Sequence, residues 1–138
     1  NAIPVDMETL LQNADVISLH CDLNDGSRSM INEKQFSLMK PTAIFLNTAR
    51  GGLVDYDALF DALDRNVIAG AGLDVFEIEP VTEDNALLGH PNFHGTPHIG
   101  AATKEAQHRV GIDIGEAVDS ALGKKTCNTL VNRTVQPR

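Results

Sequence analysis

Short apolar runs alternate with amphipathic segments along most of this 138-residue chain. From Asp6 to Asn13 the apolar residues recur at the three- and four-residue spacing of one helix face. Asp15 to Leu19 follows as a mostly apolar run, which suits a strand that is buried on both faces of a parallel sheet. The first predicted elements are therefore a helix and a buried strand.

The same alternation continues to residue 75, and capping residues mark where the helices begin. The expected elements are a helix capped by Asn32, running to Met39 and closed by Pro41; a buried strand, Ala43–Asn47; a glycine-containing loop, Thr48–Val54; a helix capped by Asp55, with Leu59, Phe60 and Leu63 on its apolar face; and a strand, Val67–Val75.

The remaining sequence predicts one more strand and one long helix. Residues 77–90 are expected to be irregular, with one helical turn near Asn85–Leu88, and Phe93–Pro97 to be extended. Thr103 is expected to cap a helix that runs to about Leu122, with Gly123 as its stop. The residues expected to form the buried stripe of this helix are Ala106, Val110, Ile114, Ala117, Val118 and Ala121.

Strands and helices that alternate in this way predict an α/β fold, in which a parallel sheet is flanked by helices. Ligands of such sheets bind at the carboxyl ends of the strands. The loops that follow Leu19, Leu46, Val75 and Pro97 are therefore the places to look for functional residues.

The composition and the net charge indicate which kinds of partner can be expected. The chain is 42% hydrophobic and 22% charged, as is ordinary for a soluble globular protein, and its net charge is −8. An acidic chain repels nucleic acid and anionic membranes, so neither is an expected partner. Cys21 and Cys127 lie far apart in the sequence, which favours reduced thiols and a cytoplasmic location.

The predicted strand ends carry residues that can perform chemistry. Arg50 can hold a carboxylate through two parallel hydrogen bonds, and its alternative is a surface salt bridge. His98 can act as a general acid or base, and its alternative is a histidine satisfied within the fold. Glu79 can pair with His98 and favour its protonated form, or it can belong to a solvated acidic turn. Asp74, at a strand end, needs a partner.

Several well-known motifs are absent from the sequence. Gly70 and Gly72 resemble the start of a dinucleotide-binding fingerprint, but no third glycine follows and the segment lies inside a predicted strand. There is no P-loop, no H-E-x-x-H and no G-x-S-x-G pattern. No metal site is expected.

Four ordered motifs resemble those of the D-isomer-specific 2-hydroxyacid dehydrogenases. They are the central strand, Ala14–His20; an arginine signature, Met39–Pro41 with Asn47–Asp55; an acidic signature, Gly72–Pro80; and a histidine signature, Thr96–Thr103. Within that family, residues 103–107 and 130–132 are most similar to the phosphoglycerate dehydrogenases.

The resemblance implies a role for each candidate. Arg50 would bind the carboxylate and carbonyl of a 2-hydroxy or 2-oxo acid, His98 would exchange the proton on the C2 oxygen, and Glu79 would hold His98. NAD would be the cofactor. The residues implied to line it are Cys21, Thr48, Ala49, Arg50, Asp74, His98 and the backbone of Gly100.

The chain departs from the family pattern at Asp22, where proline is common. Proline would fix that loop, whereas Asp22 adds freedom and a negative charge beside Cys21. In the family, the glycine-rich turn and most of the substrate domain precede this segment. Residues 1–123 are therefore expected to be the second part of a Rossmann-type NAD-binding domain, and 124–138 a tail leading back towards a substrate domain.

The leading hypothesis is a fragment of a NAD-dependent enzyme that acts on 3-phosphoglycerate in serine biosynthesis. The chain, which begins with Asn1, is expected to be cut from a longer, homo-oligomeric protein and to be inactive alone. Three alternatives stay open. They are a glyoxylate or hydroxypyruvate reductase, a dinucleotide-gated corepressor-like module without catalysis, and an inactive remnant.

Overall fold

The computed structural model describes residues 2–123, which divide into two compact units, residues 2–99 and residues 100–123. The first unit holds three α-helices, α1 (Met7–Asn13), α2 (Glu33–Leu38) and α3 (Tyr56–Asp64). Its strands are β1 (Val16–Leu19), β2 (Ile44–Asn47), β3 (Gly70–Leu73) and β4 (Phe93–Gly95). Two 3₁₀ helices complete it, η1 (Gly51–Leu53) and η2 (Ala86–Gly89). The second unit contains α4 (Lys104–Leu122).

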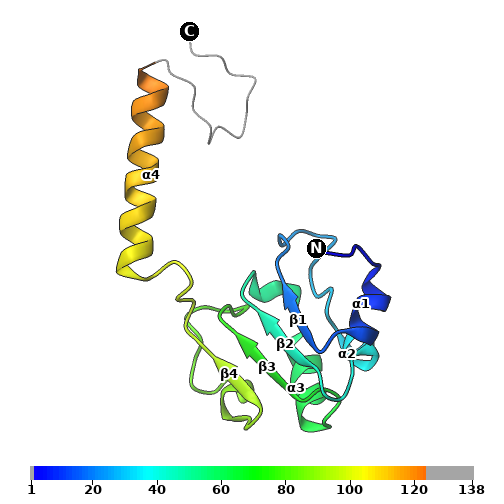
Figure 1. The fold of residues 1–138 in the computed structure, drawn as a ribbon. Coiled ribbons are helices and arrows are strands. Elements are labelled where there is room, and N and C mark those ends of the chain that lie inside the picture. The colour runs from blue at the N-terminus through cyan, green and yellow to red at the C-terminus, as the bar shows by residue number, and fades with distance from the viewer. Residues whose placement is uncertain (1, 124–138) are drawn as a thin grey trace. The chain divides into compact units, whose positions relative to one another are not determined.

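The four strands form one parallel sheet in the order β1-β2-β3-β4 (Figure 1). Each connection between neighbouring strands crosses one face of the sheet, as parallel pairing requires. This arrangement confirms the predicted α/β class. The predicted strand Val67–Val75 was too long, because only Gly70–Leu73 pairs with the neighbouring strands.

Helices α1, α2 and α3 share one hydrophobic core with the sheet. Phe36 of α2 meets Phe45 of β2 edge to face, with their ring centroids 5.4 Å apart, and both side chains are fully buried. Leu11 of α1 and Leu59 of α3 belong to the same core. The helices are therefore anchored to the sheet through one continuous layer of apolar side chains.

The opposite face of the sheet is not covered by residues of the first unit. Burial alternates along β1, where Ile17 and Leu19 are buried while Val16 is 58% exposed. On β2, Ile44 is 37% exposed although its neighbour Phe45 is buried. The expectation of strands buried on both faces was therefore wrong for these strands as the structure describes them.

Side-chain caps fix where the helices begin. Asn32 accepts a hydrogen bond from the N–H of Lys34, Asp55 from that of Ala58, and Thr103 from that of Ala106. All three caps were predicted from the sequence, and each typically contributes about 1 kcal/mol to helix stability. A turn spans residues 25–29, and the predicted helical turn near 85–88 is also present.

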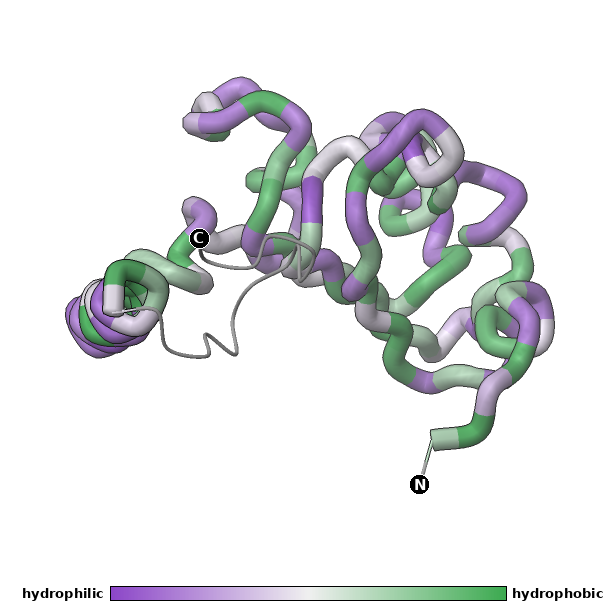
Figure 2. The backbone as a smooth tube through the Cα atoms, turned by 90° about the horizontal axis from the view of Figure 1, so that it is seen from above, coloured by the Kyte–Doolittle hydropathy of each residue, from purple (hydrophilic) through white to green (hydrophobic). Residues whose placement is uncertain are grey.

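Helix α4 has the predicted bounds but not the predicted burial. None of its residues is buried, and Val110, Ile114 and Val118 are each more than half exposed. The helix carries both hydrophobic and hydrophilic residues (Figure 2). Its apolar stripe indicated correctly which face is apolar, but it could not indicate what packs against that face. The tail from 124 to 138, including Leu130 and Val131, lies outside the described residues.

No helix in residues 2–123 combines the length and the apolar character needed to cross a membrane.

The Phe36–Phe45 pair is expected to dominate the stability of the first unit. Replacing Phe45 with alanine should lower the free energy of unfolding by about 3–5 kcal/mol, because it leaves a cavity in a closed core. Urea denaturation followed by circular dichroism measures this loss. Val16→Ala, on the exposed side of the neighbouring strand, is the matched control and should cost less than about 1 kcal/mol. Equal losses in both variants would contradict a one-sided core.

Candidate active site

The ends of the four strands lie at one edge of the sheet. The parallel register aligns Leu19 with Asn47, Asn47 with Leu73, and Leu73 with Gly95. The loops that follow these residues carry the candidates named by the sequence, and all but Gly100 belong to the first unit. The topology thus places the loops that follow the four strands at one edge of the sheet.

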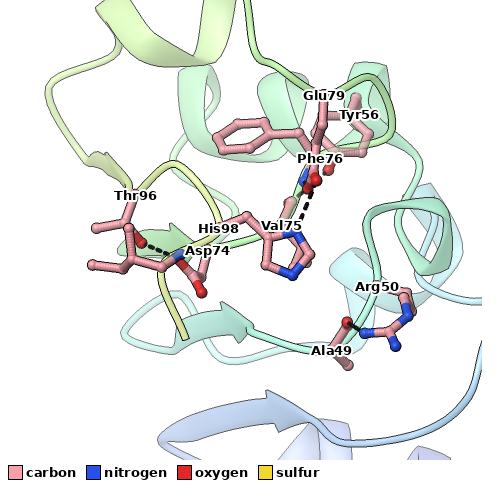
Figure 3. Close-up of polar contacts among 10 residues, drawn as sticks. Ala49, Arg50, Tyr56, Asp74, Val75, Phe76, Glu79, Thr96 and His98 are labelled. Carbon is pink, nitrogen blue, oxygen red and sulfur yellow. Dashed lines mark hydrogen bonds and ion pairs between the residues drawn. The ribbon is translucent and has the colours of Figure 1, made fainter. Parts of the chain in front are cut away.

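Glu79 and His98 form the central contact of this edge (Figure 3). The Nδ1 atom of His98 lies 2.7 Å from Oε2 of Glu79, and Oε1 of Glu79 accepts the N–H of Phe76 at 2.9 Å. The hydrogen bond from Phe76, followed by that from His98, holds the pKa of the Glu79 carboxyl below its ordinary value. An ionised carboxylate only accepts hydrogen bonds, so Nδ1 carries the proton of this contact and Nε2 is the ring nitrogen outside it.

Asp74 fixes the backbone on both sides of His98. Its Oδ1 atom accepts the hydroxyl of Thr96 at 2.6 Å and the N–H of Ile99 at 2.9 Å. Between these contacts His98 adopts a φ of 56°, and its own N–H reaches the carbonyl of Thr96. A positive φ is uncommon outside glycine and is held here by its surroundings. The expectation that Asp74 needs a partner is confirmed.

A buried asparagine shapes the loop that carries Arg50. Asn47 is fully buried, donates through Nδ2 to the carbonyl of Arg50, and accepts the N–H of Ala49 through Oδ1. Arg50 itself is exposed and donates through NH1 to the carbonyl of Ala49. Among residues 2–123 it forms no ion pair, so the surface salt bridge that was its alternative is not present. Its charge is available for an anion from outside the chain.

Gly51 joins two loops that follow neighbouring strands. They are the arginine loop, residues 48–54, and the acidic loop, residues 74–80. A Cβ atom placed on Gly51 would lie well inside 3.0 Å of the backbone of Phe76 and Glu77, so only glycine fits. The neighbouring Gly52 packs against the side chains of Leu23 and Arg28. Gly51 therefore allows two segments of the protein to approach each other.

Tyr56 is a supporting residue that the sequence did not indicate. Its hydroxyl donates to the carbonyl of Val75 at 3.1 Å, and its ring lies 6.4 Å from that of Phe76. Burial raises the pKa of the Tyr56 hydroxyl to about 12, and the nearby carboxylates of Glu77 and Glu79 add to the rise. Nothing in the sequence around a tyrosine at the start of a helix points to this contact with a segment 19 residues away.

Cys21 is a predicted cofactor residue whose side-chain contact in the first unit is with Met30 and not with Glu79 or His98. Cys21 is exposed, and its Sγ lies 3.7 Å from Sδ of Met30. The Ser27 hydroxyl donates to the carbonyl of Asp22, which follows Cys21 in the same loop. This hydrogen bond restrains the chain at the position where proline is common in the family. Gly100 belongs to the second unit, and its role stays a prediction.

Within residues 2–123, no three His, Cys, Asp or Glu side chains gather closely enough to hold a metal ion.

Replacing Gly51 with alanine is expected to force the two loops apart. The variant should lose at least about 1–3 kcal/mol of unfolding free energy, because the new methyl group meets backbone atoms that cannot rotate away. Urea denaturation gives the loss, and the NMR signals of the His98 ring report any change at the Glu79 contact. Gly89→Ala is the control, since a Cβ there meets nothing within 4 Å. A Gly51→Ala protein as stable as the unsubstituted chain would contradict the contact.

The Glu79 carboxylate is expected to stabilise the fold only above the ordinary pKa of glutamate. Because its pKa is lowered in the folded state, the unfolded chain binds this proton more tightly, and the stabilising effect is lost as the pH falls. The stability difference between the unsubstituted chain and Glu79→Gln should therefore be largest near neutral pH and shrink as the pH falls below 4.5. Urea denaturation across a pH series tests this, with Glu83→Gln as the control. A difference that grows in acid would contradict it.

Comparison with curated proteins finds similarity to two kinds of enzyme. The chain is 43% identical over 133 residues to D-3-phosphoglycerate dehydrogenase 3, chloroplastic, of Arabidopsis thaliana, covering 96% of this chain and 23% of that protein. It is 46% identical over 121 residues to a hydroxypyruvate reductase of Thermotoga maritima, covering 86% of this chain and 40% of that protein. The chain therefore spans between about a quarter and two fifths of these relatives.

Solved structures show the same fold and point to one family. A D-lactate dehydrogenase with NAD+ from Lactobacillus jensenii matches with a TM-score of 0.82 and 33% identity, covering 94% of this chain and 43% of that chain. A glyoxylate reductase from Paecilomyes thermophila matches with a TM-score of 0.84 and 36% identity, covering 98% and 44%. The pattern of the D-isomer specific 2-hydroxyacid dehydrogenase, NAD binding domain, matches residues 1–100, and the chain therefore belongs to this family.

Proposed function

We propose that this chain supplies the catalytic edge of an oxidoreductase that converts a D-2-hydroxy acid, most favourably 3-phosphoglycerate, and its 2-oxo acid into each other. The observation that carries the proposal is the Glu79–His98 contact, which lies at the same sheet edge as an arginine without an ion pair among the described residues. A carboxylate anchor and a proton carrier are the two groups that this reaction requires of the protein.

Arg50 is proposed to bind the carboxylate of the substrate. Its guanidinium presents donors in a planar fork that matches two carboxylate oxygens, and it is exposed. Asn47 holds the backbone of the loop, while Gly51 locks that loop against the acidic one. The backbone of Arg50 is thus held at a fixed distance from the loop that carries Glu79, although the side chain of Arg50 extends into solvent.

His98 is proposed to exchange a proton with the C2 oxygen through Nε2. In the oxidation direction it accepts the hydroxyl proton, and the positive charge that forms on the ring is stabilised by Glu79 at Nδ1. In the reduction direction the proton returns to the oxygen. Asp74 supports this exchange by fixing the backbone that presents His98.

The nicotinamide ring of NAD would give or take the hydride at C2. The residues at the ends of β2 and β3 fit that end of a dinucleotide, because Thr48 is exposed, Ala49 is small, and the Asp74 carboxylate is fixed by hydrogen bonds. Thr48, Ala49 and Asp74 are therefore proposed to hold the nicotinamide. The complete glycine-rich pyrophosphate turn is absent from this sequence, so tight binding is proposed to need a further segment.

The remaining parts of the proposal concern the whole protein. The chain is proposed to work as the second part of a NAD-binding domain within a longer, homo-oligomeric polypeptide and to be inactive by itself. The similarity to phosphoglycerate dehydrogenases over 96% of the chain supports 3-phosphoglycerate as substrate. The similarity to a hydroxypyruvate reductase supports hydroxypyruvate or glyoxylate as the second candidate. A cytoplasmic location stays a prediction from the sequence.

Turnover of the full-length protein that carries this chain tests the proposal. With NAD it is expected to oxidise 3-phosphoglycerate, and the 138-residue chain alone is expected to show no turnover. Replacing His98 with glutamine should lower kcat/KM by about 10²–10⁴-fold, because the proton carrier is lost. The change in absorbance of NADH measures each rate.

His94→Gln is the control, since His94 lies on β4 and none of the side-chain contacts described for the site involves it. Faster turnover of NADH with hydroxypyruvate or glyoxylate than of NAD with 3-phosphoglycerate would select the second candidate. No turnover with any 2-hydroxy or 2-oxo acid would overturn the proposal.

A further inference from the structure

A cavity lies beside α3, and it is lined by residues other than the proposed catalytic ones. It has a volume of about 550 Å³, and it is formed by the first turns of α3 and by residues between 76 and 87. Arg50, Glu79 and His98 do not line it. A volume of this size lies within the range of small-molecule pockets, roughly 300–1,000 Å³.

Aromatic rings form the inner wall of this cavity. Tyr56 and Phe76 lie side by side, with ring centroids 6.4 Å apart and planes tilted by 35°, and Phe60 of α3 adds a third ring. Val81 and Leu87 contribute aliphatic surface. Such walls favour a flat or short apolar body, and the faces of aromatic rings attract cations.

Carboxylates provide the charged part of the lining. They are Asp57, Asp61, Glu77 and Asp84, and no lysine or arginine is among the lining residues. Glu77 lies 4.0 Å from Arg28, a contact at the limit of an ion pair between two side chains that are more than half exposed. In residues 2–123 the other three carboxylates have no ion-pair partner. The negative charge around the rings is thus largely uncompensated.

We propose that this cavity binds a small organic cation, an amidinium or guanidinium group carried on a short apolar body. The rings would take the apolar body, and the carboxylates would take the planar cation through charge-assisted hydrogen bonds. The same charges exclude anions such as nucleotides and phosphorylated acids, so the cavity is not a second site for the substrate or cofactor of the proposed reaction.

The cavity shares residues with the support of the active site, among them Tyr56 and Phe76. The ring of Phe76 lines the cavity, while the N–H of Phe76 donates to Glu79 (Figure 3). A bound cation therefore contacts a residue that holds the Glu79 carboxylate. The amide signal of Phe76 serves as a reporter of occupancy in the experiment below.

Benzamidine titrated into the ¹⁵N-labelled chain tests the proposal. Benzamidine is expected to shift the amide signals of Phe76 and of its neighbours in the cavity wall. Benzamide, a neutral molecule of nearly the same shape, should bind at least about fivefold more weakly, because it lacks the charge. The Asp61→Asn variant should weaken the binding of benzamidine by roughly two- to fivefold, the usual range for one exposed ion pair.

Asp64→Asn is the matched control. It removes the same charge from the same helix, but Asp64 does not line the cavity, so binding should stay unchanged. The proposal would be overturned by benzamide binding as well as benzamidine, by equal effects of Asp61→Asn and Asp64→Asn, or by no saturable shift at all. The test involves no turnover, so its outcome is independent of the proposed dehydrogenase activity.

Discussion

The candidate site depends on the contact between the backbone of Gly51 and the backbone of Phe76 and Glu77. Two loops that leave neighbouring strands touch here without side chains between them. One loop carries Arg50, and the other carries Glu79, whose carboxylate accepts the N–H of Phe76. Any side chain at position 51 would separate them. A close backbone contact cannot be adjusted by rotating a side chain, so it sets the spacing of the two functional loops more rigidly than packing alone would.

Two carboxylates hold different parts of His98 and its surroundings. Asp74 holds the backbone on both sides of the histidine, through Thr96 and Ile99, and thereby supports an uncommon φ of 56°. Glu79 holds the ring through Nδ1. With the backbone and the ring each fixed by its own partner, Nε2 is directed without a contribution from a ligand. A proton carrier that is oriented beforehand loses less conformational entropy when the substrate binds.

Local charge, and not net charge, decides what each surface of this chain can bind. The chain carries a net charge of −8, yet Arg50 stands without an ion pair among the described residues and can receive an anion. In the cavity beside α3, carboxylates such as Asp61 and Asp84 lie with aromatic rings and suit a cation. Phe76 belongs to the lining of this cavity and also donates its N–H to Glu79, so the two sites share a residue although they suit ligands of opposite charge.

The sequence by itself indicated most of the helices and strands, the caps at Asn32, Asp55 and Thr103, and a parallel sheet, because these depend on neighbours within a few residues and on the alternation of elements. It also brought Glu79 and His98 to the same sheet edge, where the structure pairs them. Only the tertiary structure decided that Gly51 meets Phe76, that Tyr56 holds Val75, and which side of the sheet is left uncovered. Such contacts join residues about 20 or more positions apart. A periodic pattern shows that a face is apolar, but the packing partner of that face is fixed only when the whole chain closes around its core.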